Sequence, residues 1–202
     1  MSCVVALVDN GEIYMGADSF CADGTTFYPV ADQKIFTKKG FLIGCSGKFR
    51  VIHLIHHTLI LPDFQSGQSL EQYLNTNFVD AVRDCLRKAG SLKNESGIET
   101  TDAVMLVGHE GRLFVVDEDF NVSEISSDFF SIGNGQDAAL GALYALKRNT
   151  SLSPLACIQQ ALEAAEKFTI NVRSPFIVLK MDREGEIARF PTIYSSTGPS
   201  AG

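Results

Sequence analysis

The first part of the chain alternates short apolar runs with polar turns, as β-hairpins do. The apolar runs 3–8 and 13–17 flank Asp9-Asn10-Gly11, which predicts two antiparallel strands joined by a tight turn. Short strands are also expected at 34–37 and 41–45. The intervening segment 18–33 is polar and contains glycine and proline, so we expect a loop or an irregular hairpin there.

Apolar residues spaced three and four positions apart then predict helices. The clearest helix begins with a capping box formed by Ser69 and Gln72 and ends near Gly90. The polar stretch 91–100 after it is expected to be a mobile loop. The predicted helices span 48–59, 69–90, 136–147 and 154–168.

Strands return between and after the helices. The later ones are expected at 103–107, 112–116, 122–124, 130–132, 176–181 and 187–190. Strands in hairpins and helices in pairs predict an α+β fold, with antiparallel sheets and helices packed outside them. No linker divides the chain, so 1–194 is predicted to be a single domain, and the small, polar residues 195–202 a disordered tail.

Composition excludes several classes of protein. With 202 residues, 45% hydrophobic and 20% charged, the chain has the balance of a soluble globular protein. A net charge of −7 without a basic block argues against nucleic acid or an anionic membrane as partner. No run approaches the ~18 apolar residues of a membrane helix. The five cysteines are scattered and never form a CxxC pair, which predicts a reducing, cytoplasmic location and neither disulfides nor zinc.

Two further motifs have ordinary structural explanations. His53 and His57 have the spacing of a metal-binding pair, but no third ligand follows at a typical distance, so a packing or interface role is favoured. Gly133-Asn134-Gly135 precedes a helix but lacks both phosphate-loop patterns. Its glycines either allow a strand-to-helix turn or let backbone amides line an active-site wall. No cofactor is expected.

The N-terminus carries the strongest chemical signal. Removal of Met1 would give Ser2 a hydroxyl and a free α-amine, whose ordinary pKa of ~7.7–8.0 suits a general base near neutral pH. A frayed first residue is the alternative, but Ser2 leads directly into an apolar strand.

Asp18 and Lys34 recur along the chain at the same interval, because Asp18 lies sixteen residues after Ser2 and Lys34 sixteen after Asp18. A lysine beside the nucleophile would lower the pKa of its hydroxyl and amine, and an aspartate would orient that lysine. By spacing alone, a structural salt bridge is the more frequent explanation.

These residues resemble the start of the proteasome β-subunit and HslV group of N-terminal nucleophile hydrolases. The matching motifs are Ser2-Cys3-Val4-Val5-Ala6-Leu7, Met15-Gly16-Ala17-Asp18-Ser19, Lys34-Ile35-Phe36, Phe41-Leu42-Ile43-Gly44-Cys45-Ser46-Gly47 and Phe130-Ser131-Ile132-Gly133-Asn134-Gly135. The resemblance covers residues 2–182. Its first third is specific, whereas 59–98 matches poorly.

The resemblance implies a four-layer α/β/β/α sandwich with two antiparallel sheets. It implies a peptidase with Ser2 as nucleophile and the Gly47 amide in the oxyanion hole. It also implies a peptide or unfolded-protein substrate, no metal, and a closed homo-oligomeric ring, and leaves open whether an ATPase docks on that ring.

Several residues depart from the family pattern. Ser2 replaces the usual threonine, Asn134 replaces a serine that assists the N-terminal amine, and Glu166 replaces an aspartate. These departures favour a rival interpretation, a catalytically inactive ring or scaffold protein. The retained Asp18 and Lys34 favour the enzyme. A small-substrate amidohydrolase with the same mechanism is a third interpretation.

Overall fold

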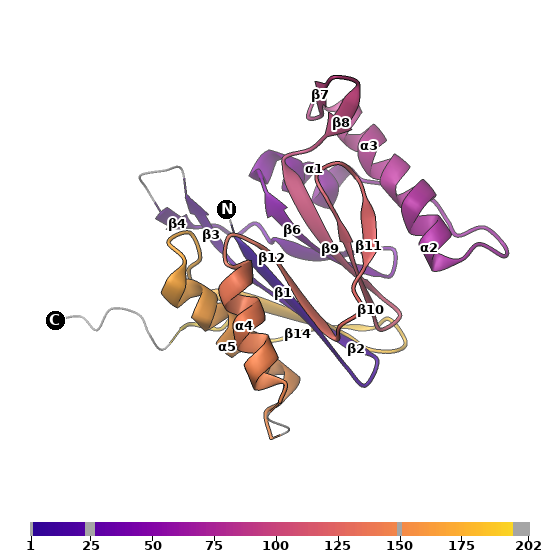
Figure 1. The fold of residues 1–202 in the computed structure, drawn as a ribbon. Helices are drawn as coiled ribbons and strands as arrows, with labels where there is room; N and C mark the ends of the chain where they lie inside the picture. The colour runs from indigo at the N-terminus through magenta and orange to yellow at the C-terminus, as the bar shows by residue number, and fades with distance from the viewer. Residues whose placement is uncertain (1, 23–26, 149–150, 196–202) are drawn as a thin grey trace.

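The computed structural model describes residues 2–22, 27–148 and 151–195, and its strands form two five-stranded antiparallel sheets (Figure 1). The first sheet has the order β12 (Phe129–Gly133), β1 (Cys3–Asp9), β2 (Glu12–Asp18), β13 (Phe176–Met181), β14 (Ile187–Arg189). The second has the order β11 (Val122–Glu124), β10 (Arg112–Val116), β9 (Ala103–His109), β6 (Phe41–Gly47), β5 (Ile35–Lys38). Two small hairpins join β3 (Phe20–Ala22) to β4 (Phe27–Pro29) and β7 (Lys93–Glu95) to β8 (Ile98–Thr100).

Helices cover the outer face of each sheet, and Figure 1 shows the two helical layers on opposite sides of the molecule. The helices are α1 (Phe49–Thr58), α2 (Leu70–Tyr73), α3 (Val79–Lys88), α4 (Gln136–Leu146) and α5 (Pro154–Phe168). The first three contribute to a core with the second sheet, and α4 and α5 to a core with the first sheet. The predicted four-layer α/β/β/α sandwich of the α+β class is confirmed.

The pattern of β1 shows why the sheets lie in the middle. Cys3, Val5 and Leu7 pack towards α4 and α5, while Val4 and Ala6 pack into the core between the two sheets. Both faces of the strand are therefore buried, which explains its continuous apolar run.

The predicted hairpin turns are present. Asn10 and Gly11 have φ of 49° and 77°, the left-handed pair that a tight hairpin turn requires. The segment 18–33 contains the expected irregular hairpin in β3 and β4.

The helix predicted over 69–90 is interrupted. Ser69 caps it by accepting a hydrogen bond from the Gln72 amide, as the capping box predicts. Residues Leu74–Phe78 then form a π-helical segment between α2 and α3. Leu74 and Phe78, at the two ends of this segment, are both buried in the core.

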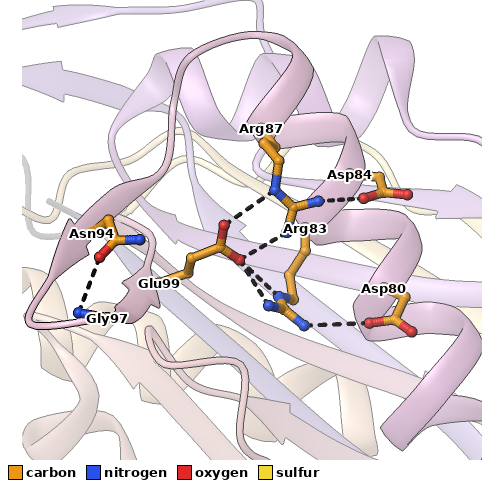
Figure 2. Close-up of polar contacts among 7 residues, drawn as sticks. All are labelled: Asp80, Arg83, Asp84, Arg87, Asn94, Gly97 and Glu99. Atoms are coloured by element: carbon orange, nitrogen blue, oxygen red, sulfur yellow. Dashed lines mark hydrogen bonds and ion pairs between the residues drawn. The ribbon is translucent and has the colours of Figure 1, made fainter.

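The predicted mobile loop at 91–100 is wrong, because β7 and β8 form a hairpin there. Figure 2 shows its attachment to α3: the Glu99 carboxylate accepts hydrogen bonds from the guanidinium groups of Arg83 and Arg87. The donor–acceptor distances are 2.8–3.2 Å. Apolar patterning misses this hairpin because charged hydrogen bonds hold it in place.

Part of the chain lies outside this description. The tail predicted for 195–202 falls there from residue 196 onward, and so does Met1. The single-domain assignment stays a prediction. Among the described residues, no helix has the length and apolar character needed to cross a membrane.

The Glu99 contact predicts a pH-dependent hairpin. Hydrogen bonds from Arg87 and Arg83 lower the pKa of Glu99 to about 2. Their stabilisation is therefore present above the ordinary carboxyl pKa of 4.5 and is lost as pH falls towards about 2. We expect Glu99→Gln to speed hydrogen exchange of the β7 and β8 amides at neutral pH. Glu95→Gln, on the same hairpin, is the control, and equal exchange in both variants would contradict this role.

Candidate active site

Ser2 lies immediately before β1, at the end of the first sheet that faces the end of β6. Its side chain is buried, with 1% of the residue exposed. The Ser2 Oγ donates a hydrogen bond to the Ser46 Oγ at 2.6 Å. Because Ser46 lies in β6 of the second sheet, the two hydroxyls connect the sheets at this end.

Asp18 and Lys34 form a buried ion pair beside Ser2. Antiparallel pairing sets Ala17 opposite Val4, so Asp18 at the end of β2 lies next to the beginning of β1. The Lys34 Nζ lies 2.8 Å from the Asp18 Oδ2, and the two side chains are 1% and 0% exposed. The other carboxylate oxygen, Oδ1, accepts a hydrogen bond from the Cys3 amide at 2.9 Å.

The ammonium group of Lys34 has a second acceptor. It donates to the Phe20 carbonyl at 2.8 Å as well as to Asp18, and it lies 5.6 Å from the centre of the Phe49 ring. Its position is therefore set by groups from three segments of the chain.

Burial dominates the electrostatics of this region. Desolvation raises the pKa of Asp18, although the Lys34 charge and the hydrogen bonds act in the opposite direction. Burial also raises the pKa of the Cys3 thiol to about 12, so the thiol stays protonated at neutral pH. Cys3 therefore lacks the thiolate that a competing nucleophile needs.

Two glycines allow close backbone approach around Ser2. Gly47 has a φ of 147°, and a Cβ there would lie 2.1 Å from the Asp102 carbonyl oxygen. Gly133 has a φ of 95°, and its Cβ would lie 2.3 Å from the Ser2 carbonyl oxygen. Any side chain at either position would displace the backbone that surrounds the site.

The glycine motif before α4 is explained by packing. A Cβ on Gly135 would lie 2.8 Å from the Ala165 Cβ and 2.9 Å from the Cys3 Cβ. Together with Gly133, this glycine lets β12 and α4 pack directly against β1 and α5. The geometry therefore favours the structural explanation of the motif over a phosphate loop.

Two predicted site residues, Asn134 and Glu166, form no hydrogen bond with Ser2 or with the Asp18–Lys34 pair in the part of the chain that the structure describes. Asn134 is exposed, and its side chain forms no hydrogen bond within the described residues. Glu166, on α5, accepts a hydrogen bond from the Ser174 amide at 2.8 Å through Oε1, while its buried Oε2 has no partner among the described residues. Their catalytic roles stay predictions.

The histidines lie on α1. The His53 Nε2 is 3.3 Å from the Asp32 Oδ2 without the alignment of a hydrogen bond, and His56 stacks on Phe36 with 4.3 Å between ring centres. Across the described ranges, no three His, Cys, Asp or Glu side chains are placed to hold a metal ion.

Sequence reasoning missed Ser46. Alternation along β6 carried the signal: Gly44 faces the first sheet, where its Cβ would lie 2.5 Å from Val4, and Ser46 two residues later faces the same way. Alternation by itself puts Ser46 on the same face of β6 as Gly44, and only the packing of the two sheets shows that this face meets Ser2.

Proteins with similar sequences are named as HslV subunits, and a protein with a similar fold is titled BPH. The chain is 28% identical over 114 residues to the "ATP-dependent protease subunit HslV" of Caldicellulosiruptor saccharolyticus, covering 56% of this chain and 65% of that protein. It is 26% identical over 179 residues to the HslV of Cytophaga hutchinsonii, covering 87% and 93%. The structure matches "Thiobacillus denitrificans BPH in complex with Epoxomicin" with a TM-score of 0.76 and 22% identity, covering 89% and 98%. No family model matches the chain.

The two layered antiparallel sheets and their outer helices have the fold of the N-terminal nucleophile hydrolases. Within that class, the comparisons confirm that the chain resembles the HslV-type proteasome β-subunit family. The chain spans about two thirds of the length of the first relative, at 65%, and nearly all of the second, at 93%.

The buried ion pair predicts a pH-dependent cost of removing Lys34. Lys34→Met leaves the Asp18 carboxylate buried without its partner, which costs about 3 kcal/mol of unfolding free energy. Folding raises the pKa of Asp18, so Asp18 contributes most to the free energy of unfolding below the ordinary carboxyl pKa. This contribution declines as pH rises through the raised value. Without Lys34 the pKa of Asp18 rises further, so the unfolding free energy that Lys34→Met loses relative to the wild type grows with pH.

Urea unfolding at about pH 5 and about pH 8 measures this deficit. Lys39→Met is the control, because Lys39 pairs with Asp63 at the surface and such pairs contribute about 0–1 kcal/mol. A deficit that is the same at both pH values would contradict the electrostatic explanation.

Proposed function

We propose that this chain is a proteasome-like peptidase that hydrolyses peptide bonds with Ser2 as its N-terminal nucleophile. One observation carries the proposal: the buried Lys34–Asp18 pair lies beside Ser2, and the Asp18 carboxylate also accepts the amide of the next residue, Cys3. Burying two charges costs free energy even when they are paired, so a buried pair beside Ser2 favours a functional role over a purely stabilising one. The relatives named as HslV protease subunits support the same class of reaction.

The chemistry requires the removal of Met1. While Met1 is attached, the Ser2 nitrogen is an amide and cannot act as a base. Once it is freed, the α-amine accepts the Oγ proton as Oγ attacks the substrate carbonyl carbon. The Gly47 amide stabilises the resulting oxyanion.

The intermediate then collapses in two stages. The C–N bond breaks, the leaving amine takes the proton from the Ser2 ammonium, and an ester to Oγ remains. A water molecule, deprotonated by the same α-amine, attacks that ester and releases the carboxylic acid with Ser2 restored. Atoms and protons balance without a metal or cofactor.

Lys34 is the electrostatic partner of this cycle. Its charge favours the alkoxide of Ser2 and the unprotonated amine. Asp18 and the Phe20 carbonyl take two of its three N–H bonds, and the third has no hydrogen-bond partner within the described residues. We assign Asn134 to the N-terminal amine and Glu166 to the wall formed by α5.

The proposed setting is a closed homo-oligomeric ring in the cytoplasm that degrades peptides or unfolded proteins, with an ATPase as regulator. Exposed apolar side chains on the α4 and α5 layer support assembly. Tyr144, Phe168 and Ile170 are 63%, 81% and 73% exposed in the single chain.

Ser2→Ala is expected to abolish hydrolysis of a fluorogenic peptide, because it removes the only proposed nucleophile. The fold and assembly should be unchanged, as judged by circular dichroism and native mass. Ser127→Ala, an exposed serine bonded to the Phe129 carbonyl, should retain full activity. Turnover that survives Ser2→Ala would refute the assignment.

The intact mass of the purified, untagged chain tests the required processing. We expect a mass lower than that of the full sequence by one methionine residue. A chain that retains Met1 has no α-amine at Ser2, and such a result would favour the inactive scaffold over the peptidase.

A further inference from the structure

The contact between Ser2 and Ser46 has no part in the reaction described above. It joins two hydroxyl oxygens at 2.6 Å, in residues only 1% and 7% exposed. The two residues are 44 positions apart in the sequence and belong to different sheets. A short hydrogen bond between such distant residues depends on the tertiary structure and directly involves the oxygen that would attack the substrate.

A serine nucleophile has more rotational freedom than a threonine. A β-branched side chain is restricted at χ1, whereas an unbranched one has three staggered positions open to it. A serine at residue 2 therefore requires an additional contact if Oγ is to face the substrate in one orientation.

Ser46 is itself held in place. Its strand pairs with β9, with Ser46 opposite Val104 and Gly47 opposite Ala103. Next to it, Gly47 packs so closely on the Asp102 carbonyl that no side chain fits, and the Lys48 amide donates to that carbonyl at 2.9 Å. The backbone that carries the Ser46 hydroxyl is consequently fixed.

Gly133 provides the space for this contact. A Cβ at that position would lie 2.6 Å from the Ser46 Oγ and 2.3 Å from the Ser2 carbonyl oxygen. Three strands, β1, β6 and β12, thus converge on one point, and the third of them contributes no side chain there.

We propose that Ser46 is a positioning residue that holds the Ser2 Oγ in its reactive rotamer. This inference rests on the proposed function of Ser2. The hydrogen bond from Ser2 to Ser46 supplies the rotational restraint that a branched nucleophile has within its own side chain.

The hydroxyl of Ser46 also suits the later steps. A hydroxyl accepts and donates by rotation about its C–O bond. Before attack, Ser46 accepts the Ser2 proton in a hydrogen bond. For attack, the Ser2 O–H turns to the free α-amine and the Ser46 O–H turns to donate to the Ser2 Oγ, so the contact persists while the Ser2 proton passes to the amine.

Steady-state kinetics of Ser46→Ala test the proposal on chains without Met1. We expect kcat to fall about tenfold, equal to about 1.4 kcal/mol of barrier, with KM changed less than about twofold. Adding Ser2→Thr to Ser46→Ala should restore most of the lost kcat, because the methyl group of threonine replaces the missing restraint. Ser123→Ala, a serine-to-alanine change in β11 of the same sheet, should have no effect.

Crystal structures of the wild type and Ser46→Ala give a second readout that does not depend on activity. We expect a single position for the Ser2 Oγ in the wild type and at least two in the variant. A single unchanged rotamer in Ser46→Ala, or an unchanged kcat in an enzyme that depends on Ser2, would overturn the proposal.

Failure of the proposed peptidase function can be told apart from failure of the proposed role of Ser46. In that case the wild type lacking Met1 shows no peptide hydrolysis, or Ser2→Ala remains active. The rotamer comparison then decides by itself whether Ser46 positions Ser2.

Discussion

The buried ion pair between Lys34 and Asp18 is the constraint on which the rest of the site depends. Two opposite charges that are almost inaccessible to water are tolerated only at close range and with their remaining hydrogen-bonding groups satisfied. Asp18 accepts a further hydrogen bond from the Cys3 amide, and Lys34 donates a second one to the Phe20 carbonyl. The pair therefore fixes the beginning of β1 against the end of β2 and the beginning of β5.

The packing of the two sheets adds a second set of constraints at the same end. Gly47 and Gly133 approach backbone atoms so closely that neither position accepts a side chain. Ser46 lies between them and contacts the Ser2 hydroxyl. Ser2 is thus fixed through its backbone by one sheet and through its side chain by the other, a preorganisation that would lower the cost of reaching the transition state of the proposed reaction.

The β7–β8 hairpin at the edge of the molecule is held by charged hydrogen bonds and not by a buried core. The hairpin of β7 and β8 buries little apolar surface and depends on the charged hydrogen bonds of Glu99 to α3. Such contacts weaken with salt and acid, whereas the cores on either side of the sheets do not. Local stability is therefore expected to fall from the sheets towards this hairpin.

The sequence by itself determined the order of strands and helices apart from the β7–β8 hairpin and the π-helical segment. It also determined the capping box at Ser69 and the candidates Ser2, Asp18 and Lys34, because periodicity, turn residues and spacing are local properties. The tertiary structure decided what depends on contacts between distant residues. It brought Ser46 to Ser2, left Asn134 exposed, and turned Glu166 towards the Ser174 amide. Hydrogen bonds between residues far apart in the chain arise only when the sheets pack, so no local pattern encodes them.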